Sequence, residues 1–149
     1  MIVRYRDGVL DGGEPDGLLL DDFAGLTERV SGLLDRVELT NALDEIWTRV
    51  QRLNRYVEEP APWRLAKDSA RAGDLDRVLR TLAEGLRVVS VLLNPYLPDS
   101  TAKLLDALGA PDLSLAGADF GAGAVRKVQA LEPLFPKQDA GEPAPVGPA

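Results

Sequence analysis

Apolar residues recur every three or four positions through most of the chain, in segments separated by glycine, proline and short polar stretches. This spacing places the apolar residues of each segment on one face of a helix. It predicts a helix over Leu18 to Glu38 and, after a break around Leu39, a second helix over Asn41 to Glu58. The apolar stripe of the second helix includes Trp47, which we expect to be a core residue.

A further helix is predicted over Leu75 to Leu93, the most apolar stretch of the sequence. Asp74 precedes it and has a side chain typical of a helix N-cap. Because apolar residues lie on nearly every side, we expect this helix to be the buried centre of a bundle. A shorter helix is predicted over Asp99 to Leu108, with Pro98 in its first turn and Gly109 after its end.

The two ends of the chain have different patterns. Met1 to Arg6 is typical of the last turns of a helix, with a left-handed stop at Gly8; a frayed strand is the alternative. Residues 113–128 are rich in small residues and residues 131–136 contain two prolines, so we expect a return segment that packs along the bundle surface. Residues 139–149 are rich in proline, alanine and glycine, which predicts a disordered tail.

The predicted domain is an all-α bundle of four or five helices over residues 1–138, with a truncated first helix and an extended C-terminal return segment. At 149 residues the chain has the size of one domain.

Cysteine and histidine are absent, which excludes disulfides, thiolate or imidazole metal sites and catalysis by a histidine base. The longest apolar run, Val88 to Leu93, is much too short to span a membrane, so we expect a soluble, cytoplasmic protein without a membrane partner.

The net charge of −7 argues against a protein that coats nucleic acid or binds DNA through a generally basic surface. The charge is uneven, because one window is net positive in an otherwise acidic chain. We expect an electropositive patch there, built from Arg49, Arg52, Arg55, Arg64, Lys67 and Arg71.

Two prolines and a tryptophan form a short motif within this window, Pro60-Ala61-Pro62-Trp63. Each proline fixes its own φ angle and pushes the residue before it toward extended geometry, here Glu59 and Ala61. We therefore expect a stiff corner that holds Trp63 in one place. Trp63 could have a structural role, packed against the ends of the helices, or it could stack on an unpaired RNA base. The residues alone favour the structural role.

No set of side chains in the sequence has the composition of a catalytic site. The adjacent acidic pairs at 21–22 and 58–59 point to different sides of a helix or turn and are interpreted as solvated surface. The serines have no base to activate them. Gly121 to Ala124 lacks the lysine and hydroxyl residue that end a phosphate loop.

Three short motifs occur in a recognisable order. Asn54-Arg55-Tyr56 is followed shortly by Ala61-Pro62-Trp63, and Pro133-Leu134-Phe135-Pro136 stands near the end of the chain. In this order they resemble the anticodon-binding domain of bacterial methionyl-tRNA synthetase, a class I enzyme. The resemblance extends over about Met1 to Asp139 and implies the same helical bundle.

The resemblance implies a role for the proline–tryptophan corner. In that family the corresponding pair contributes to recognition of the methionine anticodon loop, which assigns this role to Pro62 and Trp63. Arg55, Arg64 and Lys67 are candidates for contacts to the RNA backbone. The family's other anticodon readers, an asparagine and an arginine, lie on the helix that enters the domain and would precede this chain.

The resemblance also implies a longer enzyme. The parent methionine–tRNA ligase uses ATP, with magnesium, to attach methionine to its tRNA in a catalytic domain whose signature motifs are absent here; the first of them requires histidine. The implied partners are the anticodon loop of methionine tRNA and the catalytic domain of the same polypeptide. The chain is interpreted as a fragment, with Met1 an internal methionine, that is inactive by itself and holds no metal or cofactor.

Two alternatives remain open from the sequence. The first is a non-catalytic helical module that binds a protein partner through an apolar groove, which the acidic net charge favours. The second is the anticodon-binding domain of another class I aminoacyl-tRNA synthetase. Binding that is insensitive to salt would favour the protein-interaction module, because phosphate contacts impose a steep salt dependence.

Overall fold

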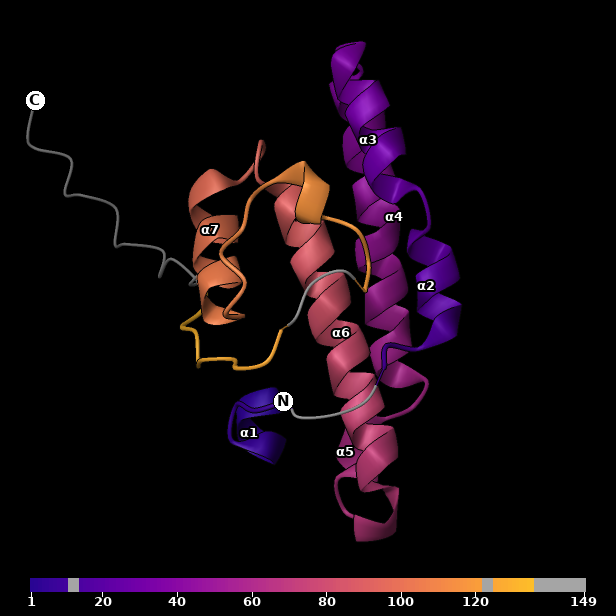
Figure 1. The fold of residues 1–149 in the computed structure, drawn as a ribbon, viewed down its shortest axis with the longest axis vertical. Helices are drawn as coiled ribbons and strands as arrows, with labels where there is room; N and C mark the ends of the chain where they lie inside the picture. Colours follow the sequence, from indigo (N-terminus) through magenta and orange to yellow (C-terminus); the bar gives the residue numbers. More distant parts are fainter. Residues whose placement is uncertain (11–13, 122–124, 136–149) are drawn as a thin grey trace, which may run out of the picture.

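The computed structural model describes residues 1–10, 14–121 and 125–135, so the predicted tail at 139–149 lies outside it. The described chain is helical, and the prediction of an all-α fold is confirmed (Figure 1). None of its helices combines the length and apolar content that a membrane span needs. The elements are α1 (Ile2–Arg6), α2 (Gly17–Phe23), α3 (Leu26–Asp35), α4 (Leu39–Glu58), α5 (Pro62–Leu65), the 3₁₀ turn η1 (Ser69–Arg71), α6 (Ala72–Leu93), α7 (Pro98–Ala107) and the 3₁₀ turn η2 (Leu115–Gly117).

Helix α6 is the centre of the fold, as its apolar sequence predicts. Leucines and valines lie on almost every side of it, and most of its residues are buried. It packs against α4 and α7 and, near its start, against α5. Figure 1 shows α7 on one side of α6 and α2, α3 and α4 on the other. Each fully buried leucine or valine contributes about 1.5–3 kcal/mol, so these contacts supply much of the stability of the bundle.

The contact between α4 and α6 depends on Gly85. A Cβ atom at this position would lie 2.4 Å from Cδ2 of Leu53, well inside van der Waals contact. Because glycine has no Cβ, the Leu53 side chain of α4 packs directly on the backbone of α6.

The prediction of one helix over Leu18 to Glu38 is wrong. The structure divides this segment into α2 and α3 at Gly25, which adopts a left-handed φ of 63°. Glycine adopts this geometry at little cost, and so it often ends a helix. The apolar spacing continues across the break, where Phe23 and Leu26 are both buried, so periodicity did not reveal it.

Trp47 is exposed, so the prediction that it lies in the core is wrong. Its exposed fraction is 53%, whereas Ile46 and Leu53 of the same helix are 0% and 7% exposed. The buried face of α4 is built from these residues with Ala42 and Tyr56, and Trp47 lies outside it. The apolar stripe of the sequence is therefore wider than the face that α3 and α6 cover.

The start of α6 also differs from the prediction. The helix begins at Ala72, so Asp74 lies inside the first turn rather than at the N-cap. There its carboxylate accepts a hydrogen bond from Nε of Arg71 at 2.9 Å. The capping carboxylate of this region belongs to Asp68, which accepts from the Ala70 amide at the start of η1. An acidic side chain in the first turn still interacts favourably with the helix dipole.

The C-terminal return lies beside the segment that follows α1. The Val128 amide donates to the Gly8 carbonyl at 2.7 Å, and the Leu10 amide donates to the Arg126 carbonyl at 2.9 Å. The expected extended return is therefore present. In its last described part, Leu131 lines a groove together with side chains of α6 and α7, whereas Phe135 is 70% exposed.

An ion pair is buried in the middle of α6. Arg87 donates to both carboxylate oxygens of Glu84, at 2.7 and 3.1 Å, and the two side chains are 5% and 3% exposed. Arg87 also donates to the carbonyl oxygens of Gly117 and Asp119, and the Gly121 amide donates to Glu84. The pair therefore fixes the irregular segment around η2 on α6. The apolar pattern of the sequence did not indicate it.

Candidate nucleic-acid interface

A left-handed residue links α4 to α5 at the proline–tryptophan corner. Ala61 has φ 47° and ψ 69°, and α5 begins directly after it with Pro62. Proline suits this first position because its fixed φ matches a helix and its missing amide would have no partner there.

The expected extended geometry before each proline is wrong for both residues. Glu59 is helical, with φ −58° and ψ −59°, and its amide donates to the Arg55 carbonyl at 3.3 Å. Ala61 is left-handed, and its carbonyl accepts from the Arg64 amide at 2.7 Å. Backbone hydrogen bonds at the end of α4 and the start of α5 therefore outweigh the local preference that a following proline imposes.

Trp63 is an exposed residue of α5. Pro62 and Leu65 are buried, Leu65 with only 3% of its surface exposed. Trp63 is 44% exposed, so much of the indole is open to solvent. Leu65, rather than Trp63, is the α5 side chain that closes this end of the core.

The end of α4 is fixed by a buried tyrosine. The Tyr56 hydroxyl donates to Oδ2 of Asp16 at 3.0 Å, and the Asp16 amide donates to Oγ1 of Thr81 at 2.8 Å. Burial raises the pKa of Tyr56 to about 12. The guanidinium of Arg52 lies 5.8 Å from the centroid of the Tyr56 ring. Tyr56 and Pro60 line the same small cleft, so these contacts lie beside the corner.

The cations of the predicted patch divide into two groups. Members of the first group are paired with acids of the same helix or of a neighbouring element. Their pairs are Arg52 with Asp22 at 2.6 Å, Arg49 with Glu45 at 3.7 Å and Arg71 with Asp74 at 2.9 Å.

The second group consists of Arg55, Arg64 and Lys67. All three are exposed, and none of them forms an ion pair within the described ranges. They lie on the last turn of α4, on α5 and on the turn after α5. The positive charge that is available to an anion is therefore gathered around Trp63 and not spread along the whole window.

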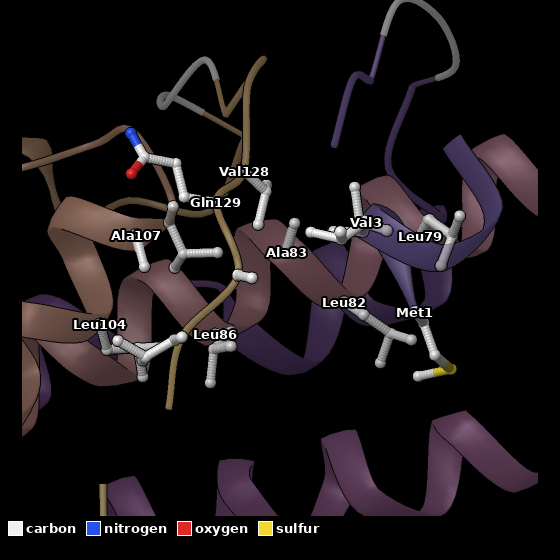
Figure 2. A pocket seen from close by; sticks show the side chains of 14 residues that line it. Met1, Val3, Leu79, Leu82, Ala83, Leu86, Leu104, Ala107, Val128 and Gln129 are labelled. Carbon is white, nitrogen blue, oxygen red and sulfur yellow. The ribbon is translucent and has the colours of Figure 1, made fainter. Parts of the chain in front are cut away.

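A second surface feature is an apolar groove of about 400 Å³ between α1, α6, α7 and the return. Leu82, Leu86 and Leu104 are among the side chains that line it (Figure 2). The amide of Gln129 points away from the apolar side chains. The groove is suited to an apolar partner.

In the part of the chain that the structure describes, no cluster of acidic, histidine or cysteine side chains is placed to hold a metal ion.

Comparison with known proteins decides the family. The sequence model of a family described as "Anticodon binding domain of methionyl tRNA ligase" matches residues 9–132, which is most of the chain. The chain belongs to this family. Because the matching family is that of the methionyl enzyme, the alternative of another class I synthetase is not supported.

Relatives of this anticodon-binding domain are methionine–tRNA ligases that are much longer than this chain. The enzyme of Bacillus subtilis is 42% identical over 151 residues, which are 95% of this chain and 23% of that protein. The enzyme of Caldanaerobacter subterraneus is 36% identical over 146 residues, which are 93% of this chain and 23% of that protein. The chain thus spans less than a quarter of the length of these relatives.

Solved methionyl-tRNA synthetases contain the same fold. The free form of the Mycobacterium tuberculosis enzyme matches with a TM-score of 0.78 at 27% identity, over 93% of this chain and 30% of that chain. The same enzyme in complex with methionyl-adenylate matches with a TM-score of 0.78 at 28% identity, over 92% and 28%. The predicted fold of an anticodon-binding domain is therefore confirmed.

The sequence did not single out the residues that support the corner of this domain. Tyr56 stands in the Asn-Arg-Tyr motif, which was the one signal available for it. Asp16 and Thr81 carry no comparable signal, because they meet Tyr56 only after the chain has folded.

Proposed function

We propose that this chain recognises the anticodon loop of methionine tRNA as part of a methionine–tRNA ligase. Trp63 stacks on an anticodon base, and Pro62 sets the position of the indole. The supporting observation is that Trp63 is 44% exposed on α5 while Pro62 and Leu65 hold this short helix against the bundle. A base stacked on an aromatic side chain contributes about 1–3 kcal/mol.

The electrostatic part of the binding is assigned to Arg55, Arg64 and Lys67. Within the described chain, no carboxylate pairs with these exposed cations, so their charge is available to RNA phosphates. Each phosphate contact releases counterions, which makes the affinity fall as salt rises. We therefore expect a clear salt dependence although the net charge of the chain is −7.

The proposed recognition serves a longer enzyme. A catalytic domain of the same polypeptide uses ATP, with magnesium, and methionine to form methionyl-adenylate and then methionyl-tRNA in the cytoplasm. The complex of the Mycobacterium tuberculosis relative with methionyl-adenylate supports this chemistry. The present chain contributes tRNA recognition and does not aminoacylate by itself.

Fluorescence titration with two RNA hairpins tests the proposal. One hairpin has the methionine anticodon loop, and the other has the same stem with an altered anticodon. A Trp47→Phe variant leaves Trp63 as the reporter, since the sequence has two tryptophans. We expect its emission to be quenched on binding, and the matched hairpin to bind more tightly than the altered one.

Two alanine variants make the test specific to the corner. Trp63→Ala is expected to weaken binding of the matched hairpin about tenfold. Trp47→Ala is the matched control, because this tryptophan is 53% exposed on α4 and is expected to leave the affinity unchanged. Equal affinities of the wild type and Trp63→Ala for the matched hairpin would contradict the proposal.

The apolar groove favours a second candidate function, a helical module that binds a protein partner. Met1, Val3 and Leu86 line the groove with 50%, 40% and 36% of their surfaces exposed. A partner held there would bind independently of salt and would be lost in a Leu86→Asp variant. RNA binding that discriminates between the two anticodons would favour the first function instead.

A further inference from the structure

One end of the bundle gathers cations that no acid neutralises. It is the end at which α4 turns into α5, where Arg55, Arg64 and Lys67 are exposed. At the opposite end, where α3 turns into α4 (top of Figure 1), Arg36 lies 2.6 Å from Glu38. Arg36 is therefore paired at its end of the bundle, whereas Arg55, Arg64 and Lys67 form no ion pair within the residues that the structure describes.

Helices α1 and α5 lie beside α6 at similar positions along its axis. Arg6 of α1 pairs with Asp76 at 2.5 Å and donates to the Ala72 carbonyl at 3.1 Å. Leu65 of α5 lines a cleft together with Val78. These α6 positions lie within about 9 Å along the helix axis, at about 1.5 Å per residue. Figure 1 shows α1 and α5 both beside the lower half of α6.

Arg4 is an exposed cation on α1. It forms no ion pair within the described chain, whereas Arg6 is occupied by Asp76. The Arg4 guanidinium lies 5.7 Å from the centroid of the Tyr5 ring. This cation–π contact restrains the side chain without neutralising its charge. Because Arg6 clamps α1 to α6, Arg4 is presented from a fixed element.

We propose that Arg4 is a further contact to the RNA backbone and that the RNA-binding surface extends from the corner to α1. The proposal rests on the proposed function, because the RNA is the hairpin whose loop base stacks on Trp63. A guanidinium suits a phosphate, to which it donates paired hydrogen bonds. A phosphate contact adds affinity without distinguishing one anticodon from another, so Arg4 acts differently from Trp63.

Filter binding over a range of salt concentrations tests the contact, with the matched and the altered hairpin. Arg4→Ala is expected to weaken both hairpins by the same factor, about three- to tenfold at low salt, and to reduce the slope of log affinity against log salt by about 1. Arg4→Lys keeps the charge and is expected to keep the slope. Lys103→Ala is the matched control, because Lys103 is an exposed cation on α7 without an ion pair in the described ranges, and it is expected to change neither value.

Three results would overturn the proposal, and they differ in what they leave standing. Unchanged affinity and slope in Arg4→Ala, with a loss in Trp63→Ala, removes the Arg4 contact and leaves the proposed function intact. No loss in either variant removes both. Equal losses in Arg4→Ala and Arg4→Lys, accompanied by lower thermal unfolding midpoints, would give Arg4 a structural role and not a role in RNA binding.

Discussion

The hydroxyl of Tyr56 donates to the Asp16 carboxylate at 3.0 Å, although the two residues are 40 positions apart in the sequence. The other carboxylate oxygen of Asp16 accepts from the Leu18 amide at 3.0 Å and caps α2. One side chain therefore joins the start of α2 to the last turn of α4. Since the proline–tryptophan corner directly follows that turn in the chain, the contact also helps to fix the position at which α5 presents Trp63.

Replacing Tyr56 with phenylalanine removes this hydrogen bond and keeps the ring. We expect Tyr56→Phe to lower the free energy of unfolding by about 1–2 kcal/mol, because a part-buried hydrogen bond to a carboxylate oxygen is lost. Urea denaturation measures the change. Tyr96→Phe is the control, since its hydroxyl donates to the Leu39 carbonyl at an exposed position. A larger loss in Tyr96→Phe would contradict the importance of burial.

The same phenol should make stability depend on pH. Burial raises the pKa of Tyr56 to about 12, whereas a tyrosine in an unfolded chain titrates at about pH 10. The folded state holds the proton more tightly, so its contribution is intact below about pH 10 and is lost as the pH rises toward 12. Denaturation at several pH values in this window should show a steeper loss for the wild type than for Tyr56→Phe. Parallel curves would contradict the assignment.

Periodicity predicted helices best where neighbours surround them. Most of α6 is buried, so its apolar residues mark both its extent and its central place. Periodicity failed at Gly25, where the apolar spacing continues through a backbone break, and at Trp47, which has the right spacing but no neighbouring helix to cover it. Local pattern records which residues are apolar; the surrounding helices decide which of them are buried.

The candidate site was predictable only in part for a related reason. The spacing of the motifs indicated Pro62 and Trp63, and composition indicated a basic window. The sequence did not show which of these cations form ion pairs, because the partner of Arg52 is Asp22, a residue of α2 that lies near it only in the folded chain. The separation of available from paired charge is thus a property of the folded chain.

Breaking the buried ion pair of α6 should be costly. Arg87→Met leaves the Glu84 carboxylate buried without its cation, and we expect a loss of about 3–5 kcal/mol in the free energy of unfolding. Arg71→Met is the control, because the Arg71 and Asp74 side chains are 56% and 47% exposed and such pairs contribute about 0–1 kcal/mol. Chemical denaturation compares the two variants.

A double variant separates the charge from the packing. Glu84→Leu combined with Arg87→Met removes both charges, so we expect it to be more stable than Arg87→Met alone. The recovery should be partial, since the Gly117 and Asp119 carbonyls still lose their donor. A double variant less stable than Arg87→Met would show that the loss of the Arg87 guanidinium beside the Glu84 carboxylate is not the main cost.

Two glycines of α6 should respond to alanine in opposite directions. At Gly85 a Cβ would lie 2.4 Å from Leu53, whereas at Gly73 it would meet nothing within 4 Å. We expect Gly85→Ala to destabilise the fold by about 1–3 kcal/mol through overpacking and Gly73→Ala to stabilise it by up to about 1 kcal/mol through helix propensity. Thermal unfolding measures both. Because Leu53→Ala removes the clashing methyl groups, a Gly85→Ala change that costs as much in that background would show that another contact sets the cost.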